Sequence, residues 1–167
     1  MNPDEIKIRE KLKPGDIGMI TYLHGKLYST EYNYDYHFES YVAEGLHEFA
    51  EKYNPEKDCL WICEHRDKII GSIFLVSRNE SAQLRYFFLL PEYRGRGLGK
   101  KLMNLFCSSL KERGYKKSFL WTTKELAAAA NLYTRFGFIL VEEKTHFLWG
   151  KEITEQKYEL VINDKSM

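Results

Sequence analysis

The chain has 167 residues and a formal net charge of +1, and 44% of its residues are hydrophobic and 15% aromatic. This length fits one domain with a substantial core, and the small net charge gives no field that would attract nucleic acid or an anionic membrane. No apolar run approaches the length of a membrane span, and the first residues contain no signal-peptide core. We therefore expect a soluble, cytoplasmic protein that binds neither nucleic acid nor membranes.

The three cysteines are an odd number, which argues against a disulfide framework. If Cys59 and Cys63 lie on one strand, they are about 13 Å apart and too distant to bridge. Cys107 lies beside the apolar stripe of a predicted helix. We expect buried free thiols. The five histidines show no spacing typical of a metal site, so we expect no metal.

The first third of the chain predicts one strand and two helices. Residues 16–24 alternate weakly between apolar and polar side chains, which favours a first strand after an N-terminal extension over residues 1–13. Residues 25–53 are helical in character, in two pieces. The second piece carries Phe38, Val42, Leu46 and Phe49 at helical spacing, and Asn54-Pro55 ends it.

The rest of the chain alternates between strands and helices. Residues 59–63, 69–76 and 84–90 read as strands joined by polar turns. A helix over residues 98–113 ends at Gly114, a strand follows at 118–122, and a helix over 124–135 precedes Gly137. Residues 138–149 and 153–161 form a closing hairpin. This order predicts a three-layer α/β domain with a mixed sheet.

The run Arg94-Gly95-Arg96-Gly97-Leu98-Gly99-Lys100 lies between a predicted strand and a predicted helix. Its glycines let a ligand approach the main chain, and the helix start directs N–H groups and the positive end of the helix dipole toward that ligand. Three cations stand within these seven residues. The run predicts a site for a phosphorylated small molecule, and the alternative is that the cations form a solvated basic surface.

With these elements in order, the chain resembles the GCN5-related N-acetyltransferase (GNAT) superfamily over about residues 16–161. Arg94-x-x-Gly97-x-Gly99 matches its pyrophosphate-binding signature, and Leu132-Tyr133 followed by Gly137-Phe138 matches its last-helix signature. The stretch Pro14-Gly15-Asp16-Ile17-Gly18 resembles a narrower group whose acetyltransferase domain is often fused behind a MarR-type winged helix. Because some fifteen residues precede this match, we expect no such winged-helix domain.

The resemblance implies one N-acetyltransferase domain over residues 1–167, with its core at about 16–162. It also implies a mostly antiparallel sheet of six to seven strands flanked by about four helices. Acetyl-coenzyme A is the implied co-substrate, with its pyrophosphate on the N–H groups of residues 95–100 and its pantetheine arm along the main chain at Leu89 and Leu90. The superfamily often binds this arm with an asparagine where this chain has Leu126, and Thr122 or Thr123 is the candidate replacement.

The same resemblance assigns candidate catalytic residues. Tyr133 matches the superfamily's proton donor to the leaving thiolate, although its spacing also fits an ordinary buried helix stripe. Glu31, between the two early helices, ranks first as general base, and Glu64 ranks second; a solvated carboxylate is the alternative for Glu31. Tyr28 and Arg85 complete the predicted acceptor pocket, in which Arg85 would bind an acceptor carboxylate or pair with an acidic neighbour.

Charge is unevenly distributed along the chain. Residues 85–117 carry nine Lys/Arg and two Asp/Glu, whereas residues 16–53 carry seven Asp/Glu and two Lys/Arg. A polyanionic cofactor favours the first segment and a cationic acceptor the second. We therefore expect direct acetyl transfer in a ternary complex to a primary amine of a small or amino-acid-like acceptor. The alternative is a non-catalytic acyl-CoA-binding sensor or a regulatory interaction module.

The aromatic segment over residues 22–41 does not fit a helix stripe throughout. Tyr32, Tyr34 and Tyr36 alternate, and they line either an acceptor pocket or a subunit interface. A homodimer is also possible, with the closing hairpin as a contact.

Overall fold

The computed structural model describes residue 2 and residues 5–163. The strands are β1 (Ile6–Arg9), β2 (Cys59–His65), β3 (Lys68–Arg78), β4 (Ser81–Leu89), β5 (Lys117–Thr123), β6 (Ile139–Leu148) and β7 (Lys151–Val161). The helices are α1 (Asp16–Tyr32), α2 (Tyr36–Lys52), α3 (Leu98–Glu112) and α4 (Ala127–Arg135), with a short 3₁₀ helix, η2 (Pro91–Tyr93), before α3.

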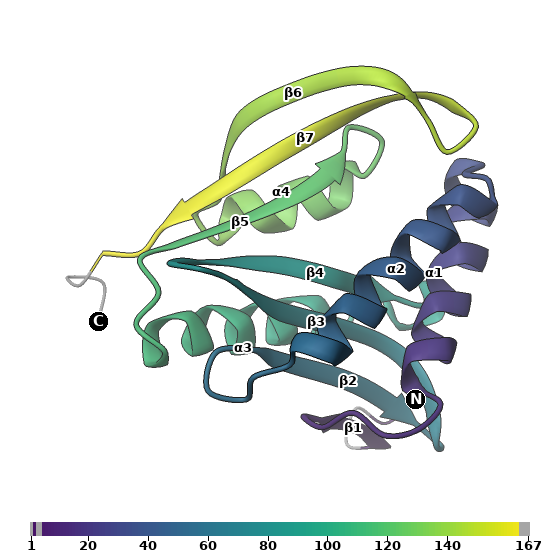
Figure 1. Cartoon of the computed structure of the whole chain (residues 1–167). Coiled ribbons are helices and arrows are strands. Elements are labelled where there is room, and N and C mark those ends of the chain that lie inside the picture. Colours follow the sequence, from purple (N-terminus) through teal and green to yellow (C-terminus); the bar gives the residue numbers. More distant parts are fainter. Residues whose placement is uncertain (1, 3–4, 164–167) are drawn as a thin grey trace.

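Within this described part of the chain, the seven strands form one sheet in the order β1-β2-β3-β4-β5-β7-β6. Every neighbouring pair is antiparallel except β4 and β5, which are parallel. Helices α1 and α2 cover one face of the sheet and α3 and α4 the other (Figure 1). The predicted three-layer α/β fold is therefore confirmed.

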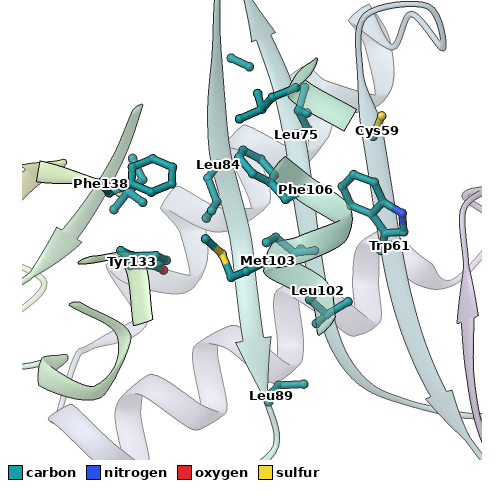
Figure 2. Packing of buried hydrophobic residues seen from close by; sticks show 14 of the residues in the cluster. Cys59, Trp61, Leu75, Leu84, Leu89, Leu102, Met103, Phe106, Tyr133 and Phe138 are labelled. Carbon is teal, nitrogen blue, oxygen red and sulfur yellow. The ribbon is translucent and has the colours of Figure 1, made fainter. Parts of the chain in front are cut away.

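Alternation along the strands produces two cores. Leu60 and Ile62 of β2 pack on the face covered by α1 and α2, whereas Trp61 and Cys63 pack on the face covered by α3. Figure 2 shows the second core, where Phe106 of α3 lies among residues of β2, β3 and β4. Because helices cover both faces, most side chains of the central strands are buried, and most of these buried side chains are apolar.

The three cysteines are free, as expected. Burial raises the pKa of Cys63 to about 12 and that of Cys107 to about 11. Both thiols therefore stay protonated at neutral pH and serve as packing groups. None of the described helices is both long and apolar enough to cross a membrane.

The strand predicted over residues 16–24 is wrong, because this segment is the first half of α1. Gly15 adopts a left-handed φ of 95°, and its carbonyl accepts the first helical hydrogen bond, from Met19. The buried residues of α1 are Asp16, Ile20 and His24, four positions apart. Two of these three are polar, so the helical period is hidden from a search for apolar residues.

Residues 6–9, which we expected to precede the fold, form the edge strand β1 paired with β2. Arg9 anchors this strand to the next element, because its Nη1 and Nη2 donate to the two carboxylate oxygens of Asp16 at 2.7 and 2.9 Å. At the opposite edge, β6 is exposed almost throughout, with Ile139 68% and Phe147 76% accessible. A dimer contact at this hairpin stays a prediction.

The feature that positions the site is the separation of β4 from β5. The two strands pair only from Ser81 to Gln83, and beyond that point they diverge (Figure 1). A bulge follows in β4, where Tyr86 has a left-handed φ of 51° and its carbonyl accepts a hydrogen bond from Ser72 at 2.6 Å. The second half of β4 therefore has β3 on one side and no strand on the other.

Candidate active site

A pocket of about 780 Å³ opens where β4 and β5 diverge. Its walls come from both faces of the sheet, because α1 and α2 contribute residues from one side and α4 and the 94–100 loop from the other. The predicted site residues that line it are Tyr28, Glu31, Arg85, Leu89, Arg94, Gly95, Gly97, Gly99, Lys100 and Tyr133. Leu90, Arg96 and Leu98 do not line it.

The glycine-rich loop leaves its main-chain donors free. The first backbone N–H of α3 with a helical acceptor is that of Lys101, which donates to Gly97 at 3.0 Å. Within the described residues, the six preceding N–H groups, at positions 95–100, have no acceptor. Gly95 and Gly97 have left-handed φ values of 73° and 84°, with no atom near either Cα where a side chain would project. These donors form an open anion-binding turn at a helix start.

Arg94 does not point freely into solvent. Its Nη1 and Nη2 donate to the two carboxylate oxygens of Glu31 at 2.7 and 3.3 Å, and its Nε donates to the Leu89 carbonyl at 2.9 Å. The candidate phosphate ligand and the candidate base therefore bind each other across the mouth of the pocket. The sequence assigned these two residues to separate roles and contained no signal of the pair.

The main chain at the end of β4 is partly occupied. Leu90 donates its N–H to Ile70 and accepts from Tyr93 at its carbonyl, each at 2.9 Å. Because main-chain groups alternate along a strand, those of Leu89 face away from β3 and toward the pocket. Leu89 thus offers its N–H to a ligand. The Leu90 carbonyl already accepts the Tyr93 N–H, so it can contact the pantetheine arm, as predicted, only by accepting a second hydrogen bond.

Both threonines proposed in place of the missing asparagine line the pocket. Thr123 Oγ1 already shares a hydrogen bond of 2.8 Å with the Tyr34 hydroxyl. Thr122 makes no side-chain hydrogen bond to any described residue, so it is the freer of the two.

Tyr133 is 6% exposed and packs its ring near Phe87, Phe138 and Tyr158. Figure 2 shows it on α4 beside Phe138, within the core under that face. Its hydroxyl has no hydrogen-bond partner among the described residues, although the side chain lines the pocket. Burial raises the pKa of Tyr133, so the phenol stays protonated at neutral pH.

The side of the pocket formed by α1, α2 and the β6–β7 hairpin has an aromatic wall. The Trp149 ring, at the tip of the β6–β7 hairpin, lies 5.1 Å from the Tyr34 ring and 4.8 Å from the Phe38 ring. The hairpin tip is fixed to the α1–α2 loop, because the Asp35 N–H donates to the Trp149 carbonyl at 3.0 Å. Burial, followed by the neighbouring Tyr133 hydroxyl, raises the pKa of Tyr28. The aromatic rings of this wall are therefore apolar and uncharged.

The alternating tyrosines have different environments. Tyr34 is 2% exposed and belongs to the core, Tyr32 lines the pocket, and Tyr36 is 75% exposed. Tyr32 and Tyr34 therefore line the pocket and Tyr36 does not, and whether they contact an acceptor or a second subunit stays a prediction.

Glu64, the second candidate base, is not placed to act as one, and neither is His24. Glu64 lies outside the pocket, where Arg9 Nη2 at 2.6 Å and Lys13 at 3.4 Å bind its carboxylate and hold its pKa below the usual range. Its second-rank assignment is wrong because β1, which pairs with β2 at this point, was not foreseen. His24 lines the pocket, but burial lowers its pKa to about 4, so its imidazole is neutral and weakly basic.

Residues 25–138 match the acetyltransferase (GNAT) family. The chain belongs to this family. An uncharacterised N-acetyltransferase of Escherichia coli, YjgM, is 30% identical over 97 residues, which cover 56% of this GNAT chain and 58% of that relative. The chain thus spans little more than half the length of this curated relative.

Solved GNAT structures share the fold. A GNAT acetyltransferase from Elizabethkingia anophelis, solved with acetyl-CoA bound, has a TM-score of 0.65 at 15% identity, covering 95% of this chain and 99% of its own. Spermidine N-acetyltransferase from Vibrio cholerae, solved with CoA and spermine, has a TM-score of 0.69 at 21% identity, covering 95% and 96%. At these identities the likeness shows the fold alone.

Several pocket residues of this GNAT chain were not foreseen. Trp149, Glu125 and Glu155 come from the hairpin and from the segment before α4, far in sequence from the other acceptor-side residues. Their spacing follows no motif, and only the paired β5–β7–β6 strands bring them to the pocket. No group of three or more potential metal ligands lies together in the described ranges.

Proposed function

We propose that this GNAT protein is an acetyl-CoA-dependent N-acetyltransferase that transfers the acetyl group directly to a primary amine of a small or amino-acid-like acceptor. The observation that carries the proposal is the row of six free N–H groups at residues 95–100 beside a pocket that reaches both faces of the sheet. The neighbours solved with acetyl-CoA and with CoA and spermine support this substrate pair.

The free N–H groups of the loop would bind the diphosphate, with Lys100 at the pocket wall and exposed Arg96 beside it adding charge. Leu89 would hold the pantetheine arm through its main chain, as an added strand, and Thr122 would supply the side-chain contact. The thioester would then lie in the part of the pocket lined by Tyr133 and the aromatic wall.

Two protons must move during the reaction. The acceptor ammonium loses one proton to a base before its nitrogen forms a bond with the thioester carbonyl carbon. The same nitrogen loses a second proton as the carbon–sulfur bond breaks and the amide forms, and the CoA sulfur takes up one proton, so that one proton is released overall. Tyr133 would donate to the sulfur, because its hydroxyl is protonated and free of other partners. Glu31 would accept the amine proton, directly or through water, once Arg94 has released its carboxylate.

Calorimetry with CoA, together with a thiol-release assay across a panel of amines, tests the proposal. We expect saturable CoA binding and amine-dependent thiol release. Gly97→Glu places a carboxylate where the diphosphate would lie, so it should weaken CoA binding at least tenfold. Gly114→Glu is the matched control, because Gly114 also has a left-handed φ, 75°, with no atom near its Cα where a side chain would project, but lies at the far end of α3.

Each negative outcome has a distinct meaning. If the parent protein does not bind CoA, the cofactor assignment is overturned. It is also overturned if the Gly97→Glu and Gly114→Glu variants bind CoA equally. Tight CoA binding without turnover of any amine would instead identify an acyl-CoA sensor.

A further inference from the structure

The acidic residues that line the pocket are all paired within the chain. Among the described residues they are three: Glu31 is bound to Arg94 at 2.7 Å, Glu125 to Lys151 at 2.6 Å, and Glu155 to His146 at 2.7 Å. A polyamine acceptor needs carboxylates for the ammonium groups that do not react. This pocket offers it no carboxylate without a partner, despite the acidic count of residues 16–53.

Arg85 is the opposite case. It lines the same pocket and is half-buried, yet it makes no ion pair or side-chain hydrogen bond to any residue described. Its guanidinium lies over the Tyr86 ring at 4.7 Å and near the Tyr41 ring at 5.4 Å. Ring faces offset only part of the cost of desolvating a cation, and they leave its N–H donors unused. No anion described in the chain therefore pairs with the Arg85 guanidinium.

A second unused donor stands at the same place. Tyr86 is 7% exposed, and its buried hydroxyl has no hydrogen-bond partner. A methyl group built on Gly45 of α2 would overlap this hydroxyl and lie 2.9 Å from Arg85 Nη2, so both groups meet above one helical glycine. Glycine inside a helix is unfavourable, and at this position it makes room for the Tyr86 hydroxyl and the Arg85 guanidinium.

The neighbouring cavity does not supply the missing anion. Arg85 and Tyr86 also border a smaller space of about 300 Å³ between α2 and the β3–β4 hairpin. Glu48, on its wall, is bound to Lys52 at 3.3 Å and to Arg78 at 3.5 Å. Asp58, also on its wall, accepts from the backbone N–H groups of Asn54 and Ser77.

We infer that Arg85 binds a carboxylate of the acceptor, so that the substrate is an amine that also carries an acid group, such as an amino acid, and not a polyamine. The inference rests on the proposed function and narrows its acceptor. The apolar wall formed by Tyr34, Phe38 and Trp149 would then contact the acceptor's side chain.

Matched acceptor pairs test this inference. Initial rates of thiol release are measured with phenylalanine against phenethylamine, with methionine against 3-methylthiopropylamine, and with spermidine. We expect the acid-bearing member of each pair to have the higher kcat/KM, by about 10- to 100-fold, because a charge-assisted hydrogen-bonded contact is lost in the other. Spermidine should be a poor acceptor.

Variants of Arg85 test whether this residue causes the preference for acid-bearing acceptors. Arg85→Met should remove the preference and bring the two members of each pair to similar values, and Arg85→Lys should retain part of it, since a lysine keeps the charge but not the planar pair of donors. Arg78→Met is the control, because Arg78 borders only the smaller cavity. CoA affinity should stay unchanged in all three, which reports that they fold.

The outcomes separate the two proposals. Equal rates for acids and amines, or faster turnover of spermidine, would overturn the carboxylate site and leave the acetyltransferase intact. If no acceptor is turned over, calorimetric titration of phenylalanine and phenethylamine into the CoA complex decides the inference: heat from the acid alone that Arg85→Met abolishes supports it, and any other pattern refutes it.

Discussion

Arg94 and Glu31, 63 positions apart in sequence, form a two-point ion pair across the pocket mouth, with N–O distances of 2.7 and 3.3 Å. Arg94 belongs to the glycine-rich loop and Glu31 to the last turn of α1, so under the proposed function the pair joins the cofactor side of the site to the acceptor side. One guanidinium cannot make full contacts with a diphosphate and with Glu31 at once. If Arg94 binds the diphosphate, cofactor binding and exposure of the Glu31 carboxylate are coupled.

Glu31→Gln tests this coupling. Removing the carboxylate charge frees Arg94, so we expect CoA to bind about two- to fivefold more tightly, in line with the loss of a partly exposed ion pair. At the same time kcat should fall if Glu31 receives the amine proton. Calorimetry and steady-state rates measure both effects. Glu125→Gln is the control, since Glu125 lines the pocket but pairs with Lys151; equal CoA affinity in both variants and the parent would contradict the coupling.

Tyr133→Phe isolates the proposed proton donor. The hydroxyl makes no internal hydrogen bond to a described residue, so its removal should leave the free energy of unfolding and the CoA affinity nearly unchanged. Loss of a general acid lowers kcat by about 10²-fold or more. Tyr158→Phe removes a hydroxyl from the same core outside the pocket and should keep full activity. A kcat for Tyr133→Phe within twofold of the parent would leave the tyrosine as a packing residue.

The buried imidazole of His24 should make the free energy of unfolding depend on pH in mild acid. Burial, reinforced by the Arg85 charge and opposed by the hydrogen bond to the Ile20 carbonyl, lowers its pKa from the ordinary 6.5 to about 4. Between these values the unfolded chain binds a proton that the native chain does not, so the free energy of unfolding decreases as the pH falls. The full difference corresponds to about 3 kcal/mol.

Urea unfolding between pH 7 and 5 measures this loss. In His24→Gln the free energy of unfolding should change less with pH over this range, whereas the exposed His47→Gln should behave like the parent. Buried or paired carboxylates such as Asp16 titrate at lower pH and do not interfere. Parallel pH profiles for the parent and His24→Gln would show that His24 does not cause the loss.

Gly71 and Gly18 form a contrasting pair of glycines. A methyl group on Gly71 of β3 would lie 2.7 Å from the Phe88 carbonyl and 2.5 Å from the Leu89 side chain, so the end of β4 must move. We expect Gly71→Ala to lower the free energy of unfolding by about 1–3 kcal/mol and to weaken CoA binding through Leu89. Gly18, exposed on α1 with open space around it, should gain up to about 1 kcal/mol when changed to alanine. Chemical denaturation of both variants provides the comparison.

Much of the fold was predictable because its signals are local. The strands from β2 to β4 are separated by polar turns in which Arg66, Asp67 and Asn79 adopt left-handed φ values. Helix α2 buries only apolar residues and glycine at helical spacing. Helix α1 instead buries two polar side chains, and β1 is a strand of only four residues, so neither has a clear periodic pattern.

The candidate site also has parts that the sequence predicts and parts that it does not. The 94–100 loop was predictable because a glycine pattern of seven residues determines its conformation. The Arg94–Glu31 pair, the Trp149 wall and the joint position of Arg85, Tyr86 and Gly45 depend on packing between distant elements. No linear count of charges could show that each acidic residue of the pocket already has a basic partner.

The divergence of β4 and β5 beyond Gln83 has a consequence for how such a protein can acquire new substrates. Under the proposed function, separate stretches of polypeptide bind the two reactants, and the Arg94–Glu31 pair joins them. Mutations in α2 or the β6–β7 tip, away from that pair, would then change which acceptor is acetylated and leave the CoA contacts intact. The same fold could therefore change its acceptor specificity while its affinity for CoA stays constant.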